Sequence, residues 1–205
     1  MNKKFITVYS VRDDLPEIMK LIQKRLEKNF KFCLDWNELF DEQEIGKMLI
    51  EYRDGALIKN EEIDPLIFKT FTLINGLNIR GMMLRDIKDG KIVLASNYIY
   101  HTLGIATIFN NHNSLRQRNA EQNLINLLEK TYFQSESNLT FLVVDQSIIN
   151  DASKKSELQK YFLKKAHQYK WNIVNNIPSP SKSNDEIQRI IFGQISKIFE
   201  NPTLF

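Results

Sequence analysis

The chain has 205 residues, of which 42% are hydrophobic and 26% are charged, which is enough for one folded domain with a real core. The net charge of +3 is mildly basic and falls well short of a dedicated nucleic-acid coat protein. The single cysteine, Cys33, excludes an internal disulfide and a cysteine-based zinc site. No stretch reaches the roughly 18 apolar residues of a membrane span, and the start of the chain lacks a signal-peptide core. We therefore expect a cytoplasmic protein with no membrane partner.

The first 55 residues have the pattern of a β-α-β unit followed by a second helix. Asp13 and Asp14 can cap the first helix, and Pro16 suits its first turn. In chain order, the pattern predicts a strand from Phe5 to Val11, a helix from Leu15, a strand from Phe30 to Leu34, and a helix from Asn37 to Arg53 that Asp54-Gly55 ends.

The middle of the chain contains a strong turn signal. Asp89-Gly90 is a typical two-residue hairpin turn, and it predicts a β-hairpin over residues 78–96 in which Ile87 faces Ile92. Residues 56–75 give no clear pattern. Residues 97–109 are apolar on most sides and predict a buried helix, and Leu124, Leu127 and Leu128 mark another helix that ends near Tyr132.

The stretch from Leu139 to Val144 is an almost unbroken apolar run that ends in Asp145. Such a run suits a strand buried on both faces, and an acid at its carboxyl end lies where open α/β sheets bind ligands. After it we expect an amphipathic helix at 156–171, a strand at 172–177, a linker at 178–183, and a last helix at 185–199 with Ser183 and Glu186 as a capping box.

This order predicts an α/β fold, with a mixed central sheet that includes a β-hairpin and is flanked by helices on both faces. We expect a single α/β domain over residues 1–177. Residues 178–205 are expected to form a C-terminal linker and an amphipathic helix packed on that domain.

The segment from Asn110 to Asn119 is the densest hydrogen-bonding stretch of the chain, and it includes His112, a candidate catalytic base. If a helix begins near Ser114, Arg116 and Arg118 fall in its first turn, where cations oppose the helix dipole. A bound anion would reverse that penalty, which predicts a phosphate-bearing ligand. The alternative is one long helix over residues 97–131, with no helix end here.

Glu121 and Asp145 form a second candidate site. Metal-dependent nucleases place a helix glutamate and a strand aspartate around a divalent ion, so both residues are candidate catalytic groups and ligands for Mg²⁺. The accompanying Glu-x-Lys pair on an adjacent strand is absent. The alternative is that Asp145, followed by Gln146-Ser147, caps a turn.

Lys160, Lys164, His167 and Trp171 have the spacing of one helical stripe. A basic stripe that ends in an aromatic ring could follow a phosphate backbone and stack on a base, so Lys160, Lys164 and Trp171 are candidate ligand-binding residues. The alternative is a solvated helix face whose lysines lie over apolar surface.

Asp13-Asp14 and Asp35 follow the first two expected strands, where receiver-like folds hold magnesium, but helix capping explains the first pair equally well. The sequence has no P-loop, dinucleotide fingerprint, nucleophile elbow or His-Glu-x-x-His motif. Short stretches at 33–39 and 92–98 resemble strands of TIR-type signalling domains, over a few residues each, and no position here matches that family's catalytic glutamate.

Three functions follow as hypotheses. The first is binding of a phosphate-rich ligand, above all nucleic acid, with metal-dependent cleavage if Glu121 and Asp145 hold an ion. The second is a non-enzymatic protein-interaction or regulatory module, which docks a partner through the last helix or residues 56–75. The third is a nucleotide-handling, TIR-like signalling domain.

Overall fold

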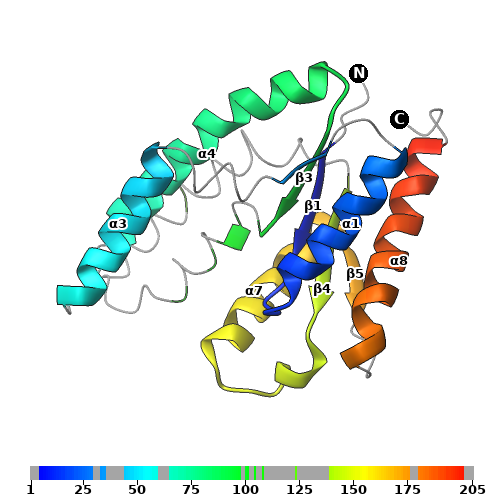
Figure 1. Ribbon diagram of the computed structural model, residues 1–205. Helices are drawn as coiled ribbons and strands as arrows, with labels where there is room; N and C mark the ends of the chain where they lie inside the picture. Colours follow the sequence, from blue (N-terminus) through cyan, green and yellow to red (C-terminus); the bar gives the residue numbers. More distant parts are fainter. Residues whose placement is uncertain are drawn as a thin grey trace.

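A five-stranded parallel sheet, in the order β2-β3-β1-β4-β5, forms the centre of the protein in the computed structural model (Figure 1). The structure describes residues 5–29, 33–35, 44–59, 65–97, 100, 101, 104, 108, 123, 139–175 and 180–200. The strands are β1 (Phe5–Tyr9), β2 (Cys33–Asp35), β3 (Ile92–Ser96), β4 (Leu139–Val144) and β5 (Asn172–Asn175).

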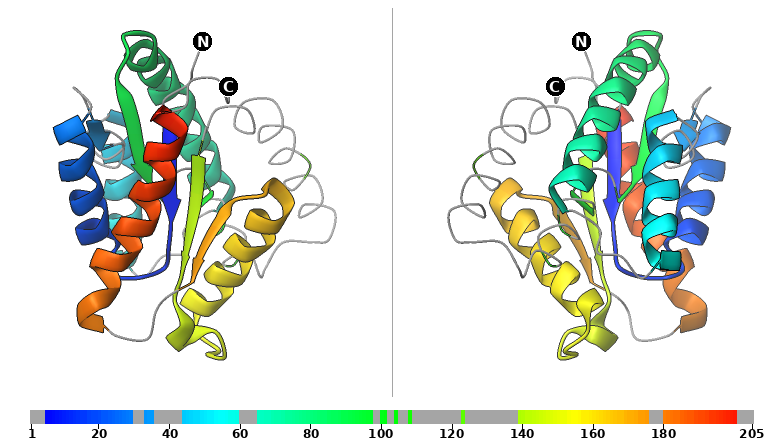
Figure 2. Two further views of the ribbon diagram at one scale, coloured as in Figure 1. Left: turned by 90° about the vertical axis from the view of Figure 1, so that its right-hand side faces the viewer. Right: turned by 90° about the vertical axis from the view of Figure 1, so that its left-hand side faces the viewer.

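Helices cover both faces of this sheet, with α1 and α8 on one face and α7 on the other (Figure 2). Single residues at 100, 101, 104 and 108 are also helical. The helices are α1 (Leu15–Asn29), α3 (Glu44–Lys59), α4 (Pro65–Lys88), α7 (Lys154–Tyr169) and α8 (Pro180–Glu200), with a 3₁₀ turn, η2 (Gln146–Ile148), after β4.

The strands β1, β3 and β4 form because their apolar runs are buried on both faces, as is typical of parallel sheets. Alternate residues of β1 enter different cores: Ile6 and Val8 pack with α1 and α8, whereas Phe5 and Tyr9 pack with α4 and α7. A Cβ atom at Gly104 would lie 2.5 Å from Leu158 Cδ1 and 2.8 Å from Tyr161 Cδ1, so a larger residue at this position would force these side chains of α7 to move.

The expected α/β class, with helices on both faces of a central sheet, is confirmed. The expected hairpin is wrong, and the described sheet is parallel rather than mixed. Asp89-Gly90 instead ends α4: the Lys91 N–H donates to Asp86 O at 2.9 Å and the Gly90 N–H donates to Ile87 O at 3.1 Å. Gly90 has the positive φ of 87° that this helix C-cap uses.

Two expected helix boundaries also differ from the structure. α3 continues through Gly55 to Lys59, because packing against α4 outweighs the roughly 1 kcal/mol cost of an interior glycine. α8 already begins at Pro180, which suits the first turn of a helix, so the expected capping box at Ser183 lies inside the helix. The buried strand at 139–144, the helix α7 and the strand β5 are confirmed.

Within the described part of the chain, no helix is both long enough and apolar enough to cross a membrane.

The last helix is part of the main core, so we expect a core substitution in α8 to destabilise the whole protein. Ile187, Ile191 and Ile195 are 0% exposed and pack with α1 and the sheet. Ile191→Ala should lower the free energy of unfolding by about 2–5 kcal/mol. Arg189→Ala, on the exposed face of the same helix, should change it by less than about 0.5 kcal/mol. Urea denaturation followed by circular dichroism measures both, and equal effects would contradict this placement of α8.

Candidate functional site

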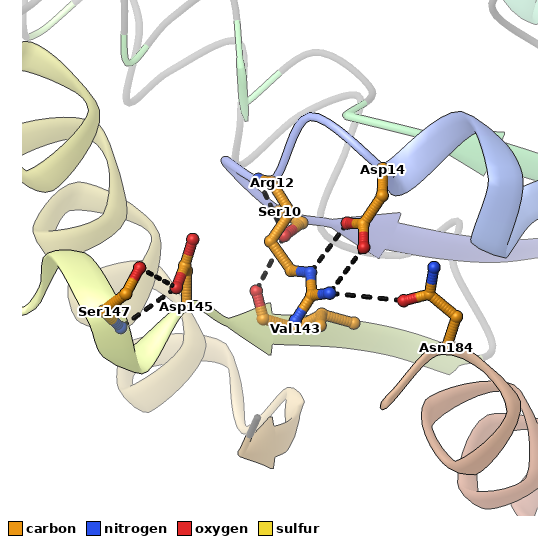
Figure 3. Close-up of polar contacts among 7 residues, drawn as sticks. All are labelled: Ser10, Arg12, Asp14, Val143, Asp145, Ser147 and Asn184. Atoms are coloured by element: carbon orange, nitrogen blue, oxygen red, sulfur yellow. Dashed lines mark hydrogen bonds and ion pairs between the residues drawn. The ribbon is translucent and has the colours of Figure 1, made fainter. Parts of the chain in front are cut away.

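The carboxyl ends of β1 and β4 lie side by side, and the helices that follow these two strands cover opposite faces of the sheet. From β1 the chain enters α1 on one face, and from the neighbouring β4 it enters α7 on the other face. Open α/β sheets bind ligands in the crevice at such a switch point, outside the carboxyl ends of the strands. Residues 10–14, which we call the β1–α1 turn, and Asp145 lie at this edge (Figure 3).

Ser10 begins the β1–α1 turn and is 1% exposed. Its backbone N–H donates to Asn97 Oδ1 at 2.9 Å, and its backbone oxygen accepts from Asn97 Nδ2 at 2.9 Å. Its hydroxyl donates to Val143 O at 2.9 Å and accepts from the Arg12 N–H at 3.2 Å. The turn is therefore fixed to the ends of both neighbouring strands, with the left-handed Asn97 (φ 47°) placing the amide.

Arg12 lies in a network with Asp14 and Asn184 (Figure 3). Its Nε donates to Asp14 Oδ1 at 2.7 Å and its Nη2 donates to Asp14 Oδ2 at 2.5 Å, which is the bidentate geometry of a strong ion pair. The same Nη2 donates to Asn184 Oδ1 at 3.2 Å. The Arg12 side chain is 10% exposed, so this network connects the turn to the first turns of α8 in a largely buried setting.

The network shifts the pKa of both charged groups toward their ionised forms. The hydrogen bond from Arg12 lowers the pKa of Asp14, against a smaller opposing effect of burial. The hydrogen bond to Asp14 raises the pKa of Arg12, and the nearby charge of Asp145 raises it further. Asp14 also precedes the first turn of α1, whose Ile18 N–H bonds its backbone oxygen at 3.1 Å. Its carboxylate therefore supplies negative charge at the helix N-terminus.

Asp145 and Gln159 form the other side of the edge. The Gln159 side-chain amide bonds both the Asp145 N–H, at 2.7 Å, and the Asp145 backbone oxygen, at 3.0 Å. Asp145 Oδ1 accepts from the Ser147 N–H at 3.0 Å and from the Ser147 hydroxyl at 2.7 Å. Asp145 thus caps η2, as the alternative interpretation of its sequence expected.

A second ion pair on the turn lies at the surface. Lys155 Nζ, from the start of α7, donates to the two Asp13 oxygens at 2.6 and 2.8 Å. The Asp13 side chain is 89% exposed and the Lys155 side chain is 54% exposed. Such an exposed pair contributes little to stability, so Asp13 is a natural control for Asp14.

Four of the expected candidate residues lie in the described part of the chain: Asp145, Lys160, Lys164 and Trp171. Asp145 lies at the edge, whereas Lys160 and Lys164 are exposed on α7. Trp171 is half-buried and stacks on the Tyr9 ring, with centroids 4.7 Å apart and planes 10° apart, so one ring face is already covered. His112, Arg116, Arg118 and Glu121 lie outside the described residues, and their roles stay predictions.

Sequence reasoning missed Ser10, Arg12, Asn97 and Asn184 as members of the edge. It considered Asp13 and Asp14 as caps or magnesium ligands, but the described residues contain no group of three or more His, Cys, Asp or Glu side chains that could hold a metal ion. The available signal was an arginine between the end of a strand and a pair of acids that begin a helix.

Comparisons with known proteins give a likeness of fold. No family model matches the chain, and no curated protein matches it. Among solved structures, thymidylate kinase from Candida albicans aligns with a TM-score of 0.69 and 12% identity over 95% of this chain and 92% of that chain. Thymidylate kinase from Ehrlichia chaffeensis aligns with a TM-score of 0.63 and 13% identity over 98% of this chain and 100% of that chain. At this identity the likeness concerns the α/β fold alone.

The first turn of the chain lacks a phosphate-binding loop. P-loop proteins have the pattern G-x-x-x-x-G-K-[S/T] between a strand and a helix, where backbone amides and a lysine hold the phosphates. Here the connection from β1 to α1 reads Ser10-Val11-Arg12-Asp13-Asp14, without glycine or lysine. The comparisons also give no support to nucleic-acid binding or cleavage, because the neighbours are nucleotide kinases.

The buried position of the Arg12–Asp14 pair predicts a pH-dependent effect on stability. Asp14→Asn keeps a helix-capping side chain and removes the charge, so it should lower the free energy of unfolding at pH 7 by about 1 kcal/mol. Because the pair lowers the pKa of Asp14, this contribution is complete above the unfolded pKa of about 4 and disappears as the pH falls through the folded pKa. Urea denaturation at a series of pH values from 7 to 3 measures it.

Asp13→Asn is the matched control for this measurement, and it should change the free energy of unfolding by less than about 0.5 kcal/mol. An Asp14→Asn effect that is the same at every pH would show that the ion pair is not its source.

Proposed function

We propose that this protein binds a phosphate-bearing ligand of the nucleotide class at the carboxyl edge of β1 and β4, with Arg12 as the partner of the phosphate. We further propose that it does not transfer a phosphoryl group from ATP by the P-loop mechanism. The observation that carries the proposal is the β1–α1 turn, which has an arginine but neither the glycines nor the lysine of a phosphate-binding loop.

Two features support a phosphate-bearing ligand. The fold is similar to that of thymidylate kinases, whose name states their substrate, and the edge lies at the topological switch point where such folds bind ligands. Arg12 is placed there by the fixed turn, with its guanidinium in the planar, two-pronged arrangement that suits carboxylates and phosphates.

Electrostatics and geometry both argue against binding of the ATP triphosphate in this turn. A P-loop surrounds the phosphates with free backbone amides, but here the amides of Ser10 and Arg12 are bonded to Asn97 and to the Ser10 hydroxyl. Asp14, the residue directly before α1, places a negative charge near the helix N-terminus, where a phosphate would bind. A triphosphate would therefore meet a like charge and lack a cation beyond Arg12 in the turn.

A direct test compares thymidine 5′-monophosphate with ATP. Titration calorimetry should detect binding of the monophosphate, and Arg12→Ala should weaken it at least about tenfold, because the charge-assisted bonds are lost. With γ-labelled ATP and thymidine monophosphate, transfer should stay far below the roughly 1–100 per second that is typical of kinases.

Lys155→Ala is the matched control, since it removes an exposed cation at the same edge that pairs with Asp13. It should leave monophosphate binding nearly unchanged. Transfer at a kinase rate, or binding that does not depend on Arg12, would overturn the proposal.

A further inference from the structure

Arg12 is held by an acid of the chain itself. The Nε and Nη2 groups of Arg12 bond the Asp14 carboxylate, and Nη2 also bonds Asn184 Oδ1. The Arg12 side chain is 10% exposed and that of Asp14 is 30% exposed, so the pair is partly buried. A ligand that uses Arg12 must therefore exchange with a partner that is already in place.

A carboxylate and a phosphate present the same pair of oxygens to a guanidinium, which is why arginine binds both in a two-pronged manner. We propose that Asp14 is a built-in competitor of the ligand phosphate: it occupies Arg12 in the free protein and thereby sets both the affinity and the class of ligand. This inference rests on the function proposed above.

The competition favours a ligand with few charges. When a phosphate displaces Asp14 from Arg12, the Asp14 carboxylate stays nearby because α1 fixes its backbone, and it then repels the phosphate. Asp145 adds a second negative charge close enough to raise the pKa of Arg12. The repulsion grows with each ligand charge, so the site selects a singly phosphorylated ligand over a di- or triphosphate.

Asn184 extends the competition to the C-terminal helix. It accepts a hydrogen bond from Arg12, and a further hydrogen bond from its side chain lowers the pKa of Asp14, so it supports both members of the pair. Removing the Asn184 amide should loosen the pair without removing a charge. Asn184→Ala is therefore a milder version of the change at Asp14, and it leaves the buried isoleucines of α8 in place.

The experiment measures binding of thymidine 5′-monophosphate and of inorganic phosphate by titration calorimetry, with circular dichroism to confirm that each variant is folded. Asp14→Asn should bind thymidine monophosphate roughly tenfold more tightly than the unaltered protein, which corresponds to about 1.4 kcal/mol. Asn184→Ala should give a smaller gain. Asp14→Glu, which keeps the carboxylate, should bind like the unaltered protein.

Asp13→Asn is the decisive control, because it removes the same charge from the neighbouring residue, whose partner is Lys155. An equal gain in Asp13→Asn and Asp14→Asn would overturn the competition and leave only an effect of net charge. Unchanged affinity in Asp14→Asn, with clear binding by the unaltered protein, would overturn the competition and leave the proposed function standing. Absence of binding in every variant would overturn both.

If Asp14→Asn does not fold, the affinity of Asn184→Ala for thymidine monophosphate tests the competition. The affinity ratio of thymidine diphosphate to monophosphate is a second measurement on the same variant. Because Asn184→Ala leaves the Asp14 charge in place, the competition predicts that both ligands gain affinity by similar factors when the pair is loosened. Unchanged affinities, or a gain for one ligand alone, would overturn it.

Discussion

Ser10 directly follows the central strand β1, and the arrangement of the carboxyl edge depends on how its polar groups are bonded. Because Ser10 is buried, its backbone N–H and C=O groups must be satisfied within the protein. Here the Asn97 amide bonds both, and the Ser10 hydroxyl joins the end of β4 to the N–H of Arg12. Neighbouring strands therefore determine the shape of the turn, whereas in a phosphate-binding loop the free amides face the ligand.

Because the amides of this turn are bonded within the protein, the chemistry of the edge does not follow from the fold. The sheet order and helix layers are those of an open parallel α/β fold that aligns with thymidylate kinases, yet a fold does not determine a reaction, which depends on the groups at its site. The Gln159 amide fixes the end of β4 by the same two-bond arrangement that Asn97 uses at the end of β1. Both turns at the edge therefore have a fixed shape without a ligand. In the β1–α1 turn, Arg12 is the side chain that we propose binds one.

The elements with a strong local signal could be predicted from the sequence. The apolar run at 139–144 gave a buried strand with Asp145 at its carboxyl end, and the amphipathic pattern before Trp171 gave α7. The hairpin was wrong because Asp-Gly suits a helix C-cap as well as a type I′ turn, and periodicity alone did not separate the two. The contacts at the carboxyl edge could not be predicted from local sequence patterns, because Ser10 and Asn97 are 87 positions apart and Arg12 and Asn184 are 172 apart.

The same ion pair bears on stability and on binding, and these two roles oppose each other. Partial burial makes the Arg12–Asp14 pair stabilise the turn, because removal of Asp14 leaves the Arg12 charge, whose side chain is 10% exposed, without its partner. The same burial makes Arg12 a strong anion partner, since its attraction to a phosphate is also weakly screened. A ligand must therefore supply interactions at least equal to those that Asp14 already provides. The exposed Asp13–Lys155 pair neither stabilises the turn much nor attracts a phosphate strongly, because water screens it. The burial of an ion pair, rather than the number of charges at the edge, therefore determines which pair can compete with a ligand for binding.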